Sequence, residues 1–359
     1  MSTDLLQPGS GPIPGEHLLA STSETVNWGW LPNAASAACL TVASGQTVTI
    51  DTLSHEGILE DQGRDPVGLL AGYGVAACDV LHDSRELAES SISHGSDDGP
   101  HVVTGPIAVA GAKPGDIMQI DILELLPRAP YGFVSSRHGY GGLPGEMPEG
   151  VEGVWQFCRV GVSGGRLVSW MSAPDGRRAC FPLDPFLGLM GVAPATSEPV
   201  HSVPPGDFGG NIDVKWAQVG TSLYLPVEVD GALFYAGDPH YAQGNGEVAL
   251  TALEAPLRAT VRLTVLSGSA SAAAVGSLRN PVIESSTHWI PTGMDVDLNE
   301  AMRKCVRHSL VFLVEHFGFT RATAMAYLSA AADFEVSQVV DVVKGVHCMI
   351  RKADFAEWH

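Results

Sequence analysis

The chain has 359 residues, of which 45% are hydrophobic and 17% charged, a balance typical of a folded globular protein and not of a disordered one. Twenty lysines and arginines against forty acids give a formal net charge of −20, which repels nucleic-acid phosphates and anionic lipid, so we expect neither nucleic acid nor membrane as a partner. The 41 glycines and 24 prolines indicate many tight turns between short elements and favour β structure.

The amino-terminal part of the sequence predicts a leader, strands and short helices. Residues 1–24 are rich in Gly, Pro, Ser and Thr, so we expect a flexible leader, although Leu18 and Leu19 could hold part of it. Residues 39–53 alternate apolar and polar positions around Ser44-Gly45, which predicts a β-hairpin. Within residues 65–87, a capping Asp65 followed by Pro66 predicts two short helices, interrupted near residues 72–74.

The middle of the chain has the pattern of a β protein. Residues 101–125 predict a second hairpin, with Pro114-Gly115 as the turn between two β-branched runs. Residues 127–150, rich in Gly, Pro and aromatic side chains, are too many for a turn and have the composition of a loop that lines a site. From residue 154 to 265 a short strand recurs about every ten residues, as in β-sandwiches and barrels.

The carboxyl-terminal part predicts two helices and a closing strand. Residues 297–316 place apolar side chains on one helical stripe that ends before Gly318, and residues 320–332 predict a second helix capped by Thr320. The apolar, β-branched run 336–350 predicts a closing strand or strand pair. The expected fold class is therefore mainly β (α+β), with β-sandwich or barrel-like units, short helices near the N-terminus and two helices near the C-terminus.

These segments suggest four parts packed as one body. They are a leader (1–24), an N-terminal β unit with short helices (25–126), a central β unit with the main site loops (127–270) and a C-terminal helical segment with a closing strand (271–359). The six cysteines include no CxxC pair, so we expect neither a thiolate metal cage nor a disulfide framework. The sequence has no export signal and no apolar run of membrane-spanning length, so we expect a cytoplasmic protein.

The densest polar cluster covers residues 237–247 and follows an apolar strand. Asp238 and His240 stand two residues apart, so on an extended chain their side chains point to the same side, and the glycines allow Gln243 and Glu247 to fold back towards them. Two carboxylates and an imidazole suit zinc or another divalent metal, with the second carboxylate as a base for a metal-bound water. An Asx turn with a surface histidine explains the same residues equally well.

A second cluster lies at residues 204–213. Its paired glycines permit a ligand to approach the backbone, and Asn211 and Asp213 share a face of the strand that enters it, but a turn between strands is the favoured interpretation. Polar runs at residues 55–65, 97–101 and 137–139 could each lend a ligand, although each alone is better explained as structural. Because no Gly-x-Ser-x-Gly elbow or Ser-Ser-Lys setting is evident, water fits better as the nucleophile.

Four separated motifs, in order, resemble the acetamidase/formamidase family. They are TGP with GAKPGD (104–116), PPGDFGGNID (204–213), GDPHYAQGNGEV (237–248) and DFEVSQVVD (333–341), and the resemblance runs from about residue 24 to the carboxyl end. The resemblance implies a mainly β hydrolase that cleaves the carbon–nitrogen bond of a small, linear, non-peptide amide and releases a carboxylate and ammonia or an amine. It also implies a divalent cation, with zinc as the first choice, and a homo-oligomer (dimer or higher).

Carried across by position, the family motifs fall on the residues of the two polar clusters. We expect the cation to be held by Asp213, Asp238 and His240. Glu247 is the expected catalytic base, which takes a proton from metal-bound water and passes it to the leaving nitrogen. Asn211 and Gln243 are the expected substrate-binding groups, as donors to the oxyanion.

This sequence departs from many relatives at two positions, and two alternative functions stay open. Asn245 stands where many relatives have an acid, and Asn27 where many have a histidine before Trp-Gly, which bears on the number of metal ligands. One alternative is a lactam or cyclic-imide hydrolase of the same family, its pocket reshaped by the loops at 55–66 and 127–150. The other is a non-catalytic β-sandwich that binds a sugar or another small ligand through the same loops.

Overall fold

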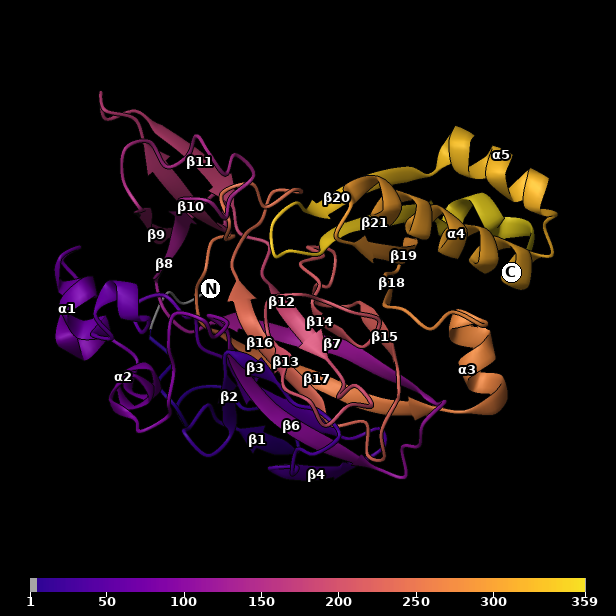
Figure 1. Cartoon of the computed structure of the whole chain (residues 1–359), viewed down its shortest axis with the longest axis horizontal. Coiled ribbons are helices and arrows are strands. Elements are labelled where there is room, and N and C mark those ends of the chain that lie inside the picture. The colour runs from indigo at the N-terminus through magenta and orange to yellow at the C-terminus, as the bar shows by residue number, and fades with distance from the viewer. Residues whose placement is uncertain (1–4, 359) are drawn as a thin grey trace.

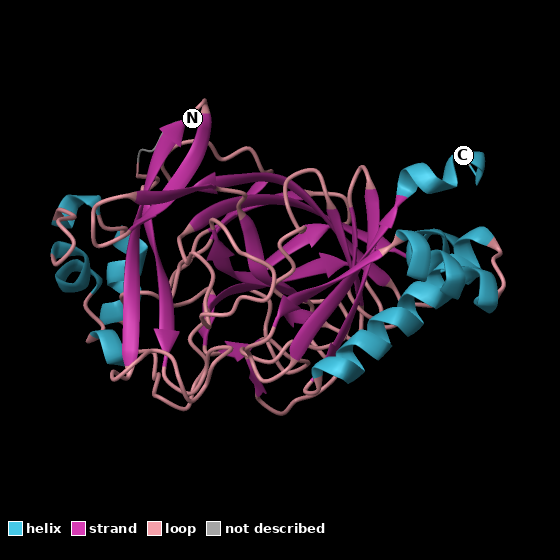
Figure 2. Cartoon of the chain, turned by 90° about the horizontal axis from the view of Figure 1, so that it is seen from above, coloured by secondary structure: helices cyan, strands magenta, loops and turns pink. Residues whose placement is uncertain are grey.

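The computed structural model describes residues 5–358, and strands make up most of its ordered structure. Helices gather at two opposite ends of the molecule, with the sheets between them (Figures 1 and 2). The helices are α1 (Pro66–Ala71), α2 (His82–Glu89), α3 (Gly268–Val275), α4 (Leu298–Phe317) and α5 (Arg321–Ala331), with 3-10 turns η1 (Glu60–Gln62), η2 (Ala77–Asp79) and η3 (Lys352–Trp358). The predicted mainly β fold with short N-terminal helices and two C-terminal helices is confirmed.

The strands form two large sheets and two smaller ones. The largest has nine strands in the order β1 (His17–Leu19), β5 (Thr47–Asp51), β17 (Leu257–Leu266), β7 (Ile117–Pro127), β15 (Ser222–Pro226), β18 (Val282–Glu284), β19 (His288–Asp295), β21 (Lys344–Arg351) and β20 (Asp333–Gln338). The second has six, β14 (Gly209–Asn211), β12 (Phe186–Gly191), β16 (Phe234–His240), β6 (Val102–Ala110) and β2 (Val26–Trp28), with β4 (Leu40–Ala43) pairing in parallel with β6. A four-stranded sheet contains β11 (Arg178–Pro182), β10 (Arg166–Ser172), β9 (Gly153–Ser163) and β8 (Tyr131–Arg137), and a ribbon joins β13 (Val200–His201) to β3 (Trp30–Leu31).

The nine-stranded and six-stranded sheets share one hydrophobic core. Ile50, Ile120 and Val261 contribute to it from the larger sheet, and Leu187 and Phe234 from the smaller one, all at most 1% exposed. Apolar residues on alternate positions of facing strands bury each other in this way, so the sheets hold the loops at their ends in fixed positions. None of the helices in the described part of the chain combines the length and apolar composition needed to cross a bilayer.

Both predicted hairpins are wrong in their pairing, although their strands exist. β4 joins β6 in the six-stranded sheet whereas β5 joins β1 and β17 in the larger sheet, and β6 and β7 are likewise divided between the two sheets. The turns at Ser44-Gly45 and Pro114-Gly115 therefore carry the chain from one sheet to the other across the core. Alternation of apolar residues defines a strand and its buried face, but it does not state which strand lies beside it.

The predicted helix boundaries are confirmed by the caps. The Asp65 carboxylate accepts a hydrogen bond from the Gly68 backbone at the start of α1, and the Thr320 hydroxyl accepts one from Thr323 at the start of α5. Gly318 ends α4 with a left-handed backbone (φ 67°). The run at 336–350 is a strand pair, β20 with β21, and α4 packs against β21 and its neighbour β19.

The segment predicted to be a flexible leader is attached to the body over residues 5–24. β1 pairs with β5, and Leu19 is buried. The buried Arg258 guanidinium donates to the carbonyls of Gln7 (3.3 Å) and Pro12 (3.2 Å) while it pairs with Asp51 at 2.6 and 2.9 Å. The carbonyls of the segment thus satisfy donors that lie out of reach of solvent. Residues 1–4 of the predicted leader lie outside the described residues.

Candidate functional site

Asp238 and His240 lie at the end of β16, with both side chains buried and on the same side, as their spacing predicts. The His240 Nε2 atom is 2.9 Å from Asp238 Oδ2 and 3.0 Å from Oε1 of a third residue, Glu254. Glu254 reaches this position because its backbone bridges to His240 on one side and to Phe133 on the other, just before β17 begins. The imidazole is therefore fixed by two buried carboxylates.

A first possible ligand group consists of Asp213, His240 and Glu247. One ligand atom from each lies within 4.8 Å of the others, and the three residues are at most 6% exposed. Both Asp213 carboxylate oxygens, His240 Nδ1 and Glu247 Oε2 are buried without a hydrogen-bond partner among the described residues. Since buried polar atoms normally have partners, and carboxylates with an imidazole are the donors that zinc accepts, this group fits a divalent cation.

Gly188 in β12 makes room for this group. A Cβ atom there would lie 2.5 Å from both Asp213 Oδ1 and Asp238 Oδ2, and 2.6 Å from the His240 ring. The Gly188 carbonyl also accepts the backbone N–H groups of Ile212 (3.0 Å) and Asp213 (3.1 Å). The absence of a side chain at position 188 thus lets three functional side chains converge over one strand.

Three of the acids have left-handed backbone conformations that non-glycine residues seldom adopt. The φ angles are 49° at Asp213, 49° at Asp238 and 45° at Glu247. Glycine neighbours and cross-strand bonds hold the loop of Glu247 in place: Gly246 donates to the Ser337 carbonyl (3.0 Å) and accepts from Val339 (3.0 Å). Such strained backbone is concentrated at functional sites, where the surrounding structure enforces it.

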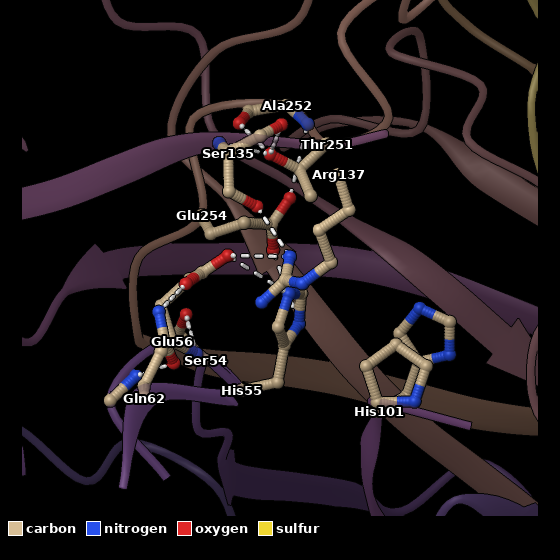
Figure 3. Close-up of polar contacts among 12 residues, drawn as sticks. Ser54, His55, Glu56, Gln62, His101, Ser135, Arg137, Thr251, Ala252 and Glu254 are labelled. Carbon is tan, nitrogen blue, oxygen red and sulfur yellow. Dashed lines mark hydrogen bonds and ion pairs between the residues drawn. The ribbon is translucent and has the colours of Figure 1, made fainter. Parts of the chain in front are cut away.

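A second possible ligand group, His55, Asp238 and Glu254, adjoins the first. The His55 Nδ1 atom is 4.0 Å from Asp238 Oδ1 and 3.9 Å from Glu254 Oε2, and its Nε2 atom is 3.3 Å from Glu56 Oε1. Arg137, at the end of β8, lies 3.5 Å from the same Glu56 oxygen (Figure 3). A chain of acidic and basic side chains therefore leads from the first group to the half-buried Arg137.

Burial and mutual repulsion shape the charge state of these acids. Burial raises the pKa of Asp213 well above its ordinary value, and the Asp238 carboxylate raises it further. Burial and the neighbouring Asp213 likewise raise the pKa of Glu247 well above its ordinary value. Burial also raises the pKa of Glu254 to about 6. Burial would raise the pKa of Asp238 too, but His240, His101 and His55 together outweigh it and bring that pKa below its ordinary value. The positive charge near Asp213 and Glu247 does not offset their burial and mutual repulsion, and a bound cation would supply more of it.

The structure places the two predicted substrate-binding residues beside this centre with most of their donors occupied. Gln243 Nε2 donates to the carbonyls of Asp213 (2.9 Å) and Ser337 (3.2 Å), so both of its protons are used. Asn211 Nδ2 donates to Asp341 Oδ2 (2.9 Å). The Gln243 Oε1 and Asn211 Oδ1 acceptors are buried without a partner among the described residues. Gln243 was predicted as a donor to the oxyanion; here its Nε2 protons go to backbone carbonyls, and its free group is an acceptor.

Four buried or half-buried groups near the centre were not among the predicted site residues: His55, His101, Glu254 and Asp341. The polar runs at 55–65 and 97–101 contained the two histidines, but neither run alone showed that they meet over Asp238, where His101 Nε2 is 3.8 Å from Oδ1. Glu254 stands between apolar residues ahead of β17, and an acid in such a setting is itself a signal of a buried charge with a specific partner.

A cleft of about 700 Å³ opens beside the first group. Glu247 and Gln243 line it, together with apolar side chains of the four-stranded sheet and of the loops around β16. A buried acid at the edge of a concave, largely apolar space is the usual arrangement of a small-molecule site. Fold and site together define a hydrolase-like centre of acids and histidine within two packed sheets.

The acetamidase/formamidase family model matches this chain over residues 88–198 and 195–351, and the chain belongs to that family. The chain is 26% identical over 304 residues to a formamidase of Methylophilus methylotrophus, covering 67% of this chain and 74% of that protein. It is 28% identical over 198 residues to an acetamidase of Mycolicibacterium smegmatis, covering 41% and 49%. The family resemblance and the prediction of an enzyme that hydrolyses carbon–nitrogen bonds in linear amides are confirmed.

Solved structures share the fold. An acetamidase from Yersinia enterocolitica superimposes with a TM-score of 0.74 at 23% identity, over 98% of this chain and 96% of that one. A gamma lactamase from Delftia acidovorans gives a TM-score of 0.54 at 20% identity, over 95% and 93%. At these identities the likeness establishes the common architecture of the chains.

Proposed function

We propose that this chain is a metal-dependent amidohydrolase that cleaves the carbon–nitrogen bond of non-peptide amides to a carboxylate and ammonia or an amine. The observation that carries the proposal is the first ligand group, in which Asp213, His240 and Glu247 present unpartnered buried atoms and Glu247 lines a cleft. The membership of a family named for acetamidases and formamidases supplies the class of reaction.

Asp213 and His240 would hold the cation. A divalent ion there would polarise the amide carbonyl and make water a stronger nucleophile at neutral pH. Asp238 was predicted as a further ligand, but its Oδ2 atom is 2.9 Å from His240 Nε2. We therefore assign it the task of orienting the imidazole, so that the unpartnered Nδ1 atom faces Asp213 and Glu247.

Glu247 is the proposed general base. Its Oε2 atom has no hydrogen-bond partner among the described residues, so it is free to take a proton from the attacking water. The water oxygen bonds to the amide carbon, the carbon–nitrogen bond breaks, and Glu247 returns the proton to the departing nitrogen. Burial and Asp213 raise the pKa of Glu247; a cation nearby would favour its carboxylate form and make it a base.

Gln243 orients the substrate as an acceptor. Because its Nε2 protons are both donated to backbone carbonyls, its Oε1 atom is the group that remains to receive an N–H of the amide. Accepting from the amide nitrogen places that nitrogen near Glu247, which lines the same cleft. Asn211, held by Asp341, keeps one donor proton for the carbonyl oxygen.

The test combines metal analysis with ammonia release. Untagged protein is assayed against formamide, acetamide, longer amides and lactams, and its metal content is measured by elemental analysis. We expect about one divalent ion in the first group per chain and turnover that falls with chelation and returns with zinc. Metal-free protein with full activity would contradict the proposal. The zinc identity, the homo-oligomer and the cytoplasmic location stay predictions.

A further inference from the structure

The cleft beside Glu247 is much larger than the smallest amides need. Its volume is about 700 Å³. Acetamide has four non-hydrogen atoms and displaces on the order of 100 Å³ if each takes the ~30 Å³ of a water molecule. Clefts of several hundred Å³ hold ligands of drug size and bury most of their surface. An enzyme that acted only on acetamide would leave most of this space to water.

The walls of the cleft are apolar on several sides. Met171 and Phe181 contribute from β10 and β11, Trp216 from the segment after β14, and Leu253 from the loop ahead of β17. These residues come from four separate stretches of the chain, so the apolar lining depends on the tertiary fold and not on the sequence of a single loop. Apolar walls favour a ligand whose hydrocarbon groups displace the water that would otherwise lie against them.

Two of the charged side chains at the cleft, Lys215 and Asp184, contact other protein groups. The Lys215 ammonium lies 5.5 Å from the centre of the Trp216 ring, and Asp184 pairs with Arg166 at 3.2 Å. Asp184 thus has a cationic partner, and the Lys215 ammonium lies against an aromatic ring of the cleft wall. The polar atoms of the lining residues Gln243 and Glu247 that lack partners among the described residues are Gln243 Oε1 and Glu247 Oε2.

The rim of the cleft is also apolar and is formed in part by the long loop after β8. Gly142 donates a hydrogen bond to the Val248 carbonyl (2.9 Å), which places this loop against a residue that lines the cleft. Val248 is 68% exposed, and the same loop exposes Tyr140 and Leu143. Apolar side chains therefore continue from the wall of the cleft to its mouth.

We infer that the preferred substrates are primary amides that carry a bulky apolar group, aliphatic or aromatic, rather than formamide or acetamide. The amide lies at Gln243 and Glu247, and the apolar group lies between Met171, Phe181 and Trp216. This inference rests on the proposed function and specifies the substrate class of the same site. Each methylene that leaves water for such a cleft strengthens binding by roughly fourfold, and this gain appears in kcat/KM.

The first experiment measures kcat/KM for ammonia release from formamide, acetamide, butanamide, hexanamide and phenylacetamide. We expect hexanamide or phenylacetamide to exceed acetamide by at least tenfold. If kcat/KM stays level or falls from acetamide to the larger amides, the inference is overturned and the proposed function remains intact. Calorimetric binding of the product carboxylates needs no turnover: hexanoate binding at least tenfold tighter than acetate supports the inference, and equal binding overturns it even if no amide is hydrolysed.

The second experiment narrows the cleft. Ala249 lines it, so Ala249→Phe should lower the ratio of kcat/KM for hexanamide to that for acetamide by at least tenfold. Met171→Trp narrows the cleft at another lining residue and provides a second variant if the first folds poorly. The matched control is Ala173→Phe, at an exposed turn outside the cleft, which should leave the ratio unchanged. An unchanged ratio in both cleft variants, with thermal unfolding like that of the parent, would overturn the inference.

Discussion

Gly188→Ala tests whether the acids and the imidazole act as one packed unit. The added Cβ atom would lie 2.5 Å from Asp213 Oδ1 and Asp238 Oδ2, about 1 Å inside the 3.4 Å at which ordinary contact begins. The backbone of Gly188 does not have a positive φ, so alanine meets no conformational penalty and the effect arises from the contacts alone. Displacing the group by about 1 Å should reduce kcat/KM by on the order of 100-fold.

The assay is amide turnover and metal content of the variant beside its parent, with urea unfolding to measure stability. Overpacking should cost about 1–3 kcal/mol in the free energy of unfolding, which a folded preparation tolerates. Gly95→Ala is the matched control, because no atom lies within 4 Å of a Cβ at that position. Full activity with full metal content in Gly188→Ala would refute the reasoning that these residues meet over one strand.

Two further predictions concern the candidate site, and a third concerns a buried ion pair of the nine-stranded sheet. Glu247→Gln should retain the metal and lower kcat by about 10²–10⁴-fold, measured by ammonia release with elemental analysis; unchanged turnover would remove Glu247 from the reaction. Since folding raises the pKa of Glu254 from 4.5 to about 6, that group stabilises the native state fully below pH 4.5, and about 2 kcal/mol is lost as the pH rises through 6. Urea unfolding of chelated protein should show this loss of stability between pH 4.5 and 8, and that of zinc-loaded protein should not. The same dependence of stability on pH in both forms would argue against a cation near Glu254. Asp51→Ala leaves the buried Arg258 without its carboxylate and should lower the free energy of unfolding by about 3–5 kcal/mol, whereas a change below 1 kcal/mol would show that the pair contributes little.

Local features of the fold could be predicted from the sequence because neighbouring residues determine them. The caps at Asp65 and Thr320 and the glycine that ends α4 depend on bonds within one turn of helix. The partners of β4 and β7 depend on residues far away in the chain, such as Ile107 beside Leu40. A turn with hairpin composition serves equally well between two strands of different sheets, so the pairing could not be predicted from the turn.

The candidate site was predictable where its residues share a motif. Asp238 and His240 point the same way because they are two apart on a strand, and the structure brings Asp213 and Glu247 to them. His55 joins the centre from the loop after β5 and Glu254 from the segment ahead of β17, and only the tertiary structure reveals their proximity. The donor or acceptor role of Gln243 also required the structure, because it depends on which of its atoms the backbone already occupies.

The most direct test of a cation between the sheets is anomalous X-ray scattering at the zinc edge from crystals of active, untagged protein. The site predicts a peak within coordination distance of Asp213 and His240, at the edge of the cleft that holds the amide. Crystals that release ammonia from an amide while no ion of any kind lies among these residues would contradict it.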